Sequence, residues 1–345
     1  MDSILVALSG GVDSSAAACL LLLQLHSIAG ATMKLLADTD DADVLDAKNV
    51  CRSLNIEHYL FDFSDLFKKQ VMDEFVRSYL SGETPNPCVD CNRFLKFGKL
   101  LNCADELGFG HIATGHYARI EYDAGSGRYL LKKAKDLSKD QSYVLYSLTQ
   151  KQLYRTLLPL GEYTKSEVRE IAAINGLQNA QKPDSQDICF VRGCNYQDFI
   201  ARHIDANGRE GDFIDTGGNT LGKHKGIENY TVGQRKGIGI AFSKPMYVCK
   251  KDSAKNTVTL GSEQELYTKT MKARDVNFIA VERLNAPVRA MIKVRYSARE
   301  APALVRQISE NEVAVEFDEP QRAIAPGQAA VFYDGEVVIG GGSIQ

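Results

Sequence analysis

The turn SGGVDSS at residues 9–15 constrains the fold of this chain more than any other stretch. Residues 4–8 form a continuous apolar run of strand length, and residues 16–25 form an Ala- and Leu-rich segment typical of a helix. Glycines in such a turn let backbone N–H groups approach a ligand, the helix N-terminus adds positive potential, and the serines add hydroxyl donors. The turn therefore predicts a phosphate site. A tight turn whose glycines serve packing alone is the plainer interpretation and fits this restrictive pattern less well.

The rest of the first half continues the alternation of strand and helix. Strand patterns at residues 28–35 and 58–63 flank a helical pattern at residues 41–54. This alternation predicts a doubly wound parallel sheet that is covered on both faces. Ligands in such sheets bind outside the carboxyl ends of the strands, so the turn, Met33 and Gly115 should converge in a nucleotide pocket. Core packing explains Met33 equally well.

Composition narrows the classes of protein that remain. A chain of 345 residues is too long for one typical core, so several domains are expected. Because the formal net charge is −3, any contact with nucleic acid must come from local patches. The N-terminus does not resemble a signal peptide and no apolar run is long enough to span a bilayer, so we expect a cytoplasmic protein without a membrane partner. Eight cysteines in such a chain favour thiol or metal chemistry over a disulfide scaffold.

Two of these cysteines lie in a segment with two prolines. The prolines disfavour helix and central strand, so residues 83–92 are expected to form an exposed, stiff loop ahead of a helix at residues 94–107. Cys88 and Cys91 should then be accessible, with a pKa lowered by the nearby helix start or arginine.

A further cysteine, Cys189, follows the polar segment KPDSQD and has the same loop-like setting. Two accessible thiols suit a sulfur relay. Three other cysteines fall inside helical patterns and are expected to be small buried hydrophobes: Cys19, Cys51 and Cys103.

The second half has a different composition, with glycine-rich turns and short β patterns from about residue 202. Basic side chains around these glycines suit contact with a phosphate backbone, although a solvated loop explains any one of them equally well. They are Lys223, Lys225, Arg235 and Lys236. Beyond residue 266, strand-length apolar runs and a hairpin turn at residues 334–335 predict a small antiparallel β-barrel. The expected domains are residues 1–201, 202–266 and 267–345.

Several motifs occur in one order along nearly the whole chain: SGGVDSS, TPNPCVDCN, ATGHY, KDQSY, DSQDICF, YTVGQRKGIGI, VRY and PGQAAVFYDGEVVIGGG. Together they resemble the tRNA-specific 2-thiouridylase family (MnmA-like), which belongs to the PP-loop ATPases. The resemblance implies that ATP, with magnesium, adenylates the 2-carbonyl oxygen of the wobble uridine of tRNA. It also implies that sulfur from a persulfide then replaces this oxygen, and that a persulfide donor protein is a partner.

The resemblance carries roles to individual residues by motif match. It implies that ATP is held by Ala7, Leu8, Ser9, Gly10, Gly11, Val12, Asp13, Ser14, Met33 and Gly115. It implies catalytic roles for Asp13, for Cys91 as the nucleophile and for Cys189 as the persulfide carrier. It implies contacts with tRNA for Asn86, Pro87, Cys88, His116, Lys139, Asp140, Gln141, Arg295, Tyr296 and Gln328.

The chain departs from the family pattern at Cys88, where an acidic residue is usual. The result is a Cys88-x-x-Cys91 spacing typical of ligands, with Cys189 as a possible third thiolate. Either the thiols act as a plain relay, or the three hold an iron–sulfur cluster whose open iron site binds the transferable sulfide. A CxxC alone is a weak metal signal and no fourth cysteine has an obvious place nearby, so the relay is the preferred hypothesis.

Two readings from other functional classes remain open from the residues. A PP-loop amide ligase would share the turn but would not need Cys91, Cys189 and the C-terminal barrel. A non-catalytic RNA-binding protein would explain the second half but would leave the phosphate turn without a purpose. Release of pyrophosphate from ATP that depends on tRNA separates all three hypotheses.

Overall fold

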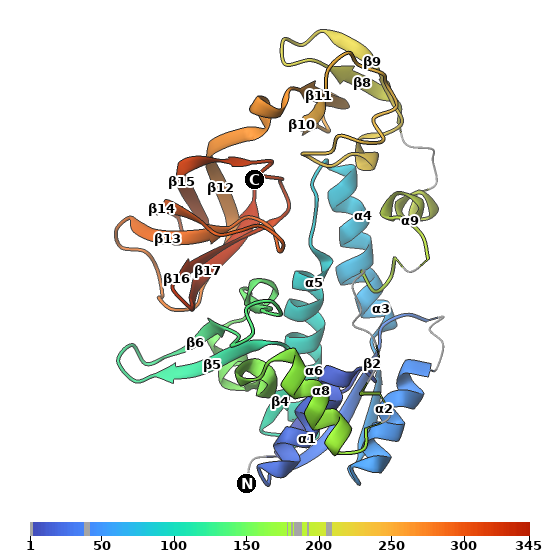
Figure 1. Ribbon diagram of the computed structural model, residues 1–345, viewed down its shortest axis with the longest axis vertical. Helices are drawn as coiled ribbons and strands as arrows, with labels where there is room; N and C mark the ends of the chain where they lie inside the picture. The colour runs from blue at the N-terminus through green and yellow to red at the C-terminus, as the bar shows by residue number, and fades with distance from the viewer. Residues whose placement is uncertain are drawn as a thin grey trace.

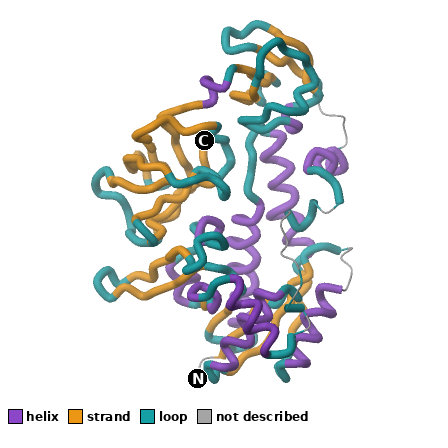
Figure 2. Tube along the Cα trace, viewed as in Figure 1, coloured by secondary structure: helices purple, strands orange, loops and turns teal. Residues whose placement is uncertain are grey.

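The computed structural model describes residues 3–37, 42–177, 179, 180, 182, 188–191, 193–204 and 209–345. These residues form an N-terminal part around a parallel sheet, a small central β part and a C-terminal barrel (Figure 1). Helices gather in the N-terminal part, whereas strands and loops make up most of the other two (Figure 2). The predicted fold class, a doubly wound sheet followed by a small β domain and an antiparallel barrel, is confirmed.

The N-terminal sheet has five parallel strands in the order β3-β2-β1-β4-β7. They are β1 (Ser3–Ala7), β2 (Ser27–Lys34), β3 (His58–Asp62), β4 (His111–Ala113) and β7 (Thr156–Leu157). Alternate side chains of β1 lie in different cores, because Ile4 and Val6 pack with the α1 and α2 side while Leu5 packs on the opposite face. Both faces are therefore covered, as a parallel sheet requires.

Helices cover these faces from several places along the chain. On one side lie α1 (Val12–Leu23), α2 (Ala42–Ser53) and α8 (Lys165–Ile174). On the other side α6 (Leu100–Glu106) packs on β4, and the same apolar core continues away from the sheet through α3 (Ser64–Phe67), the π-helix η1 (Lys68–Met72), α4 (Asp73–Leu80), α5 (Pro87–Asp90) and the π-helix η2 (Cys91–Lys99) (Figure 1). The remaining helices are η3 (Ser142–Leu145), α7 (Gln150–Tyr154), η4 (Pro159–Glu162), α9 (Tyr196–His203), η5 (Ile227–Asn229) and η6 (Glu263–Leu266).

The predicted loop at residues 83–92 is helical from Pro87 onward, so this prediction was wrong in part. Proline is well tolerated at the first helical position, where its missing N–H has no partner to lose. The side chain of Asn86 caps this helix by accepting a hydrogen bond from the backbone N–H of Cys88 at 3.2 Å. The predicted helix therefore begins earlier, and Cys88 and Cys91 lie on it.

The central part is a four-stranded sheet in the order β10-β11-β8-β9 with a core of its own. Its strands are β8 (Gly211–Ile214), β9 (Thr220–His224), β10 (Tyr247–Asp252) and β11 (Thr257–Gly261). Phe213, Val248 and Val258 are fully buried at its centre. Lys251 joins it to the N-terminal part, because its Nζ donates to the carbonyl oxygens of Tyr230 at 2.7 Å and Glu83 at 3.3 Å.

The C-terminal barrel closes where β12 pairs with both β15 and β17. Its strands are β12 (Tyr267–Phe278), β13 (Val288–Lys293), β14 (Ala301–Ser309), β15 (Glu312–Arg322), β16 (Ala329–Asp334) and β17 (Val337–Ile344). A hairpin from the N-terminal part, β5 (Ala118–Asp123) and β6 (Arg128–Lys133), extends this sheet through the pair Val337 and Lys132. The sequence patterns predicted neither β12 nor this hairpin.

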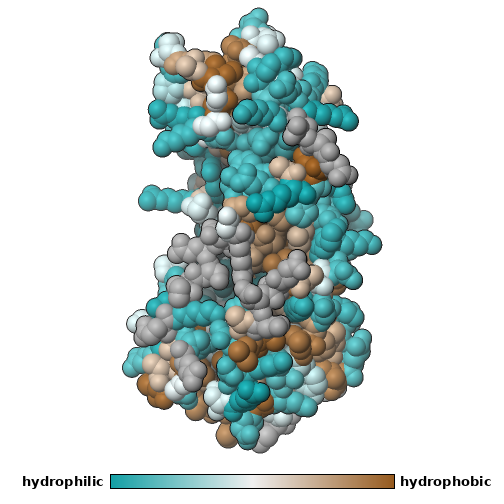
Figure 3. Space-filling view, turned by 90° about the vertical axis from the view of Figure 1, so that its right-hand side faces the viewer, coloured by the Kyte–Doolittle hydropathy of each residue, from teal (hydrophilic) through white to brown (hydrophobic). Residues whose placement is uncertain are grey.

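Polar contacts attach the barrel to the N-terminal part. Gln328 Nε2 donates to the Thr84 carbonyl at 2.7 Å, and Tyr143 Oη donates to the Ala329 carbonyl at 2.8 Å. Hydrophilic and hydrophobic side chains are mixed over the face that carries α2, α4 and α9 (Figure 3). Within the described residues, no helix has both the length and the apolar character needed to cross a bilayer.

Candidate functional site

The turn at residues 9–15 lies between β1 and α1, as predicted. Gly10 has a φ of +72°, and a Cβ there would lie 2.8 Å from both the Asp43 carbonyl oxygen and the Asp46 Cβ, so only glycine fits. Ser14 Oγ and Ser15 Oγ donate to the Gly11 carbonyl at 3.1 and 2.9 Å. No side chain among the described residues caps the N-terminus of α1, which leaves N–H groups for an anion.

Asp13 lies in the first turn of α1 and forms a partly buried ion pair with Lys165. Lys165 Nζ, from the start of α8, lies 2.7 and 2.8 Å from the two carboxylate oxygens. Tyr117 Oη donates to the same carboxylate at 2.8 Å. The Asp13 carboxylate therefore ties α1 to α8 and to the segment after β4, and sequence reasoning missed both of these partners.

The segment after β4 meets the turn, as the sheet topology predicted. A Cβ on Gly115 would lie 2.7 Å from the Asp13 carbonyl carbon and from the Ser14 nitrogen, so the two chains touch. Ala7 and Leu8 lead from β1 into the turn, and Leu8 is buried. Met33 near the end of β2 is partly buried against the core, which is compatible with packing as well as with a ligand contact.

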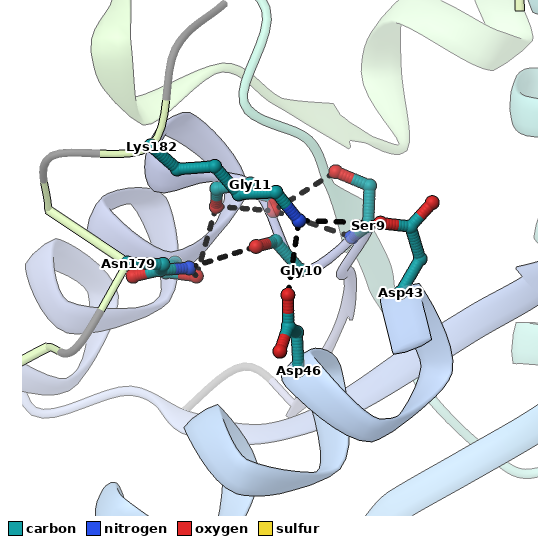
Figure 4. A network of polar contacts seen from close by, with 9 residues as sticks. Ser9, Gly10, Gly11, Asp43, Asp46, Asn179 and Lys182 are labelled. Carbon is teal, nitrogen blue, oxygen red and sulfur yellow. Dashed lines mark hydrogen bonds and ion pairs between the residues drawn. The ribbon is translucent and has the colours of Figure 1, made fainter. Parts of the chain in front are cut away.

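Two further residues reach the turn from the segment after α8, and sequence reasoning assigned them no role. Asn179 Nδ2 donates to the Gly10 carbonyl and to Ser15 Oγ, each at 2.9 Å. Lys182 Nζ lies 2.9 Å from Asp46 Oδ2 and 3.2 Å from Asp43 Oδ1 (Figure 4). The only sequence signal was a polar segment after a helix, and such segments are common.

The second half of the site contains the cysteines. Cys91 is 7% exposed, and burial raises the pKa of its thiol to about 11. Lys96 opposes this shift in the pKa, whereas Cys189, Cys88 and Asp90 add to it. Cys88 and Cys189 therefore each lie within electrostatic reach of Cys91. The prediction that Cys91 is accessible with a lowered pKa was wrong, because the helix that begins at Pro87 turns Cys91 inward.

The exposure of the other cysteines follows the predictions, but the predicted lowering of the pKa at Cys88 was wrong. Cys88 and Cys189 are exposed, and Cys19, Cys51 and Cys103 are buried. The protein around Cys88 still raises the pKa of its thiol, and Lys96 again opposes the shift. Asp90 is partly buried, and this burial, assisted by Glu74, raises the pKa of its carboxyl to about 6, with Arg93 opposing.

The π-helix η2 explains why Lys96 reaches these thiols. Hydrogen bonds in a π-helix run between residues five apart, so residues at that spacing lie closer on its surface than on an α-helix. Cys91 and Lys96 have this spacing and both belong to η2. Burial, together with Lys96, lowers the pKa of His116, the residue that follows Gly115. The ring of His116 lies 5.7 Å, centre to centre, from that of Phe97 in η2, so the Gly115-His116 pair connects the phosphate turn with the helix that carries Cys91.

An iron–sulfur cluster does not fit the thiols as they are arranged. Among the described residues, which include all three cysteines, no group of three or more His, Cys, Asp or Glu side chains is positioned to hold a metal ion. A thiol ligand must be deprotonated, and burial opposes this at Cys91. A relay needs a thiolate at Cys91 too, so this burial does not separate the two hypotheses, and the relay stays a prediction.

Some of the residues predicted to contact tRNA meet at the surface next to the thiols. Tyr296 of the barrel is 45% exposed. Partial burial of its hydroxyl raises the pKa of that group, Cys88 adds to the rise, and Lys139 opposes it. Lys293 Nζ lies 5.4 Å from the centre of the Tyr296 ring. Arg295 is partly exposed and donates to the Arg322 carbonyl at 3.0 Å. The barrel thus adds an aromatic ring within electrostatic reach of Cys88, with Lys293 beside that ring.

Three other predicted tRNA contacts are used within the protein: His116 and Asp140 are buried, and Gln141 is half-buried. His116 is 8% exposed, shares a 2.8 Å hydrogen bond with Thr114, and has a pKa well below its usual value because it is buried. Asp140 accepts hydrogen bonds from the backbone N–H groups of Ala134 and Ser142. Gln141 accepts one from the Tyr117 N–H. These groups support the shape of the site.

Three family models match almost the whole chain. Residues 2–193 match the tRNA methyl transferase HUP domain, residues 197–262 the tRNA methyl transferase PRC-barrel domain, and residues 268–344 the aminomethyltransferase beta-barrel domain.

Curated relatives match over the full length. The tRNA-specific 2-thiouridylase MnmA of Acetivibrio thermocellus is 50% identical over 354 residues, which cover 99% of this chain and 99% of the relative. The protein of the same name from Clostridioides difficile is 47% identical over 352 residues, which cover 99% of this chain and 98% of the relative. A solved 4-thiouridine synthetase–RNA complex with bound ATP matches 59% of this chain and 50% of that chain at 17% identity with a TM-score of 0.37, a likeness too weak to carry a conclusion.

Proposed function

Because the chain belongs to the tRNA-specific 2-thiouridylase family, we propose that it uses ATP to replace the 2-oxygen of the wobble uridine of tRNA with sulfur. The observation that carries this proposal is the pairing of a phosphate turn with neighbouring thiols in one domain. The turn suits ATP, and the thiols suit sulfur transfer. Gly115 touches the turn, and the ring of His116 packs beside Phe97 of η2, the helix that carries Cys91.

The first step activates the uridine oxygen. The 2-oxygen attacks the α-phosphorus of ATP, a phosphorus–oxygen bond forms, and pyrophosphate leaves. The turn at residues 9–15 and the N-terminus of α1 hold the phosphates, and Ser14 supplies a buried hydroxyl beside them. Adenylation matters because oxygen leaves a ureide carbon easily only as part of a phosphate ester.

The second step transfers sulfur. The terminal sulfur of a persulfide on Cys189 attacks the 2-carbon of the uridine, and AMP leaves with the original oxygen. The Cys91 thiolate then attacks the Cys189 sulfur, which forms a disulfide between the two cysteines and leaves the transferred sulfur on the base. A cellular thiol reductant restores the two thiols, and a persulfide donor protein reloads Cys189. The exposure of Cys189 supports access by this donor.

Magnesium would enter with ATP. The described residues offer it no group of three acidic or histidine ligands, and Asp13 is already paired with Lys165. Mg²⁺ commonly keeps several waters and binds through substrate phosphates, which fits this site. The ion would neutralise charge on the leaving pyrophosphate.

tRNA would bind across all three parts of the chain. Tyr296 lies beside Lys293 and within electrostatic reach of Lys139 and Cys88, and an exposed aromatic ring beside cations suits an unstacked base and its phosphates. In the central part, Lys225 and Lys236 line an open pocket that suits phosphate contact. We keep residues 1–201, 202–266 and 267–345 as the domains of this proposal, and we place the enzyme in the cytoplasm because it acts on tRNA.

The proposal is tested with the purified protein, unmodified tRNA, ATP and a persulfide donor. We expect pyrophosphate release that depends on tRNA, together with 2-thiouridine in the digested tRNA measured by mass spectrometry. Ser14→Ala should lose pyrophosphate release and keep tRNA binding. Pyrophosphate release without tRNA would instead favour an amide ligase, and tRNA binding without any release would favour a non-catalytic RNA-binding protein.

A further inference from the structure

The phosphate turn has no lysine of its own, because the residues after its glycines are Val12, Asp13 and Ser14. Lysine is the usual partner for the outer phosphates where a glycine-rich loop cradles a nucleotide. Lys165 lies close to the turn, but its ammonium group donates to both carboxylate oxygens of Asp13. The outer phosphates of ATP therefore need a cation from another segment.

Lys182 approaches the turn from the segment after α8. In Figure 4 its side chain extends over Gly10 and Gly11 to the carboxylates of Asp43 and Asp46. Both carboxylates belong to α2, and a Cβ on Gly10 would touch Asp46, so the ion pairs lie at the edge of the turn. The side chain of Lys182 is 39% exposed. The two aspartates raise the pKa of Lys182, which keeps it charged.

Asn179 gives independent support for a ligand beside Lys182. Its Nδ2 is fully used by Gly10 and Ser15, but its Oδ1 is buried and lacks a hydrogen-bond partner among the described residues. A buried acceptor without a partner costs free energy unless a ligand or water donates to it. Phosphate oxygens are acceptors themselves, so the donor for Asn179 Oδ1 would be a ribose hydroxyl, the adenine amino group or a water molecule. Asn179 and Lys182 therefore both lie at the turn, and the buried Asn179 acceptor leaves room for a donor from a bound nucleotide.

We propose that Lys182 binds the outer phosphates of ATP, and that Asp43 and Asp46 hold it beside the turn until the phosphates displace them. This inference rests on the proposed function, because it assumes that the turn binds ATP. The exchange is favourable on charge grounds, since a triphosphate carries more negative charge than the two carboxylates. The cost is small, because Asp43 and Asp46 are 42% and 43% exposed and regain water when Lys182 leaves. A lysine ammonium group can exchange partners in this way, because its four-carbon chain is flexible and its hydrogen bonds do not require one fixed orientation.

The alternative is that Lys182 only fastens the segment after α8 to α2. The two roles differ in their response to ligands. If Lys182 only holds the two segments together, it contributes to stability, and replacing Lys182 should have the same effect as replacing Asp43 and Asp46. A phosphate-binding lysine discriminates between pyrophosphate and AMP, and its loss should differ from the loss of the aspartates.

The test is calorimetric titration of the full chain with ATP, inorganic pyrophosphate and AMP. For Lys182→Met we expect about tenfold or greater loss of affinity for ATP and pyrophosphate, with AMP affinity unchanged. Lys182→Arg should recover much of this loss, because the charge returns. Asp43→Asn combined with Asp46→Asn breaks the same ion pairs but keeps the cation, so pyrophosphate should bind at least as tightly as it does to the wild type.

Lys68→Met is the matched control, because Lys68 also pairs with an aspartate, Asp73 at 3.1 Å, in the same part of the chain. It should leave all three affinities unchanged. Equal pyrophosphate affinity in wild type and Lys182→Met would overturn the inference, and so would a loss of equal size in the double asparagine variant. If the wild type itself binds neither ATP nor pyrophosphate, the proposed function fails as well, so the two failures are distinguishable.

Discussion

At the scale of single residues, Cys91 shows how placement changes the chemistry of a thiol. Its side chain is buried, and burial raises its pKa to about 11, so little thiolate is present near neutral pH in the free protein. Lys96 is the cation that opposes this effect. A buried thiol with a nearby lysine is protected from oxidation and alkylation until substrate binding changes its surroundings.

The first prediction concerns the reactivity of Cys91 with iodoacetamide, followed by mass spectrometry of the labelled peptide. Because the thiolate is the reactive form and its pKa is about 11, labelling should rise about tenfold per pH unit from neutral to pH ~9.5 without levelling off. Lys96→Met should slow labelling further, since it removes the opposing cation. Lys99→Met is the control, because Lys99 acts on Cys103. A plateau near neutral pH would contradict the assignment.

The second prediction concerns Cys88. In the relay, the two thiols that exchange sulfur are Cys91 and Cys189, so Cys88→Ser should keep most of the thiolation activity, whereas Cys91→Ser should lose it. The measurements are 2-thiouridine content by mass spectrometry and iron and sulfide analysis after anaerobic purification. Stoichiometric iron that disappears in Cys88→Ser together with the activity would contradict the relay and favour the cluster.

At the scale of elements, the sequence predicted the strands and helices that build the phosphate site. The apolar run of β1, the glycine turn and the helix α1 are local features, so patterns find them. The start of α5 was missed because proline was treated as a helix breaker, although it is favourable at the first helical position. The π-helix η2 has no sequence signal of its own, so the approach of Lys96 to Cys91 could not be predicted.

The third prediction tests the contact between β4 and the turn. A Cβ at Gly115 would lie 2.7 Å from Asp13 and Ser14 backbone atoms, so Gly115→Ala should displace the turn and weaken ATP binding while tRNA binding persists. Gly110→Ala is the matched control, because the nearest atom to its Cβ would be 3.7 Å away. Calorimetry with ATP measures both variants. Unchanged ATP affinity in Gly115→Ala would mean that ATP does not bind at this junction.

At the scale of the whole molecule, the arrangement of the three parts brings distant residues to one surface. Tyr296 and Lys293 come from the barrel, whereas Cys88 and Lys139 come from the N-terminal part. The barrel and its antiparallel character could be predicted from alternating apolar runs. Its closure by β12 and its extension by the β5–β6 hairpin depend on pairings between distant segments, which no local pattern contains. Asn179 and Lys182 were overlooked for the same reason.

The fourth prediction concerns Arg295, which lies beside Tyr296 on this surface. Removal of one phosphate contact weakens RNA binding and reduces the dependence of affinity on salt. We therefore expect Arg295→Ala to bind tRNA less tightly, with a shallower slope of log affinity against log salt and unchanged ATP affinity. Filter binding over a series of salt concentrations measures this slope. An unchanged slope would make Arg295 a structural residue that holds the Arg322 carbonyl.

The most direct test of the account follows the oxygen atom that sulfur replaces. tRNA is prepared with a heavy-oxygen label at the 2-position of the wobble uridine and incubated with the protein, ATP and a persulfide donor. The account predicts that each 2-thiouridine formed is matched by one AMP that carries the label, because adenylation transfers this oxygen to the α-phosphorus. Thiouridine formed together with unlabelled AMP would contradict the account.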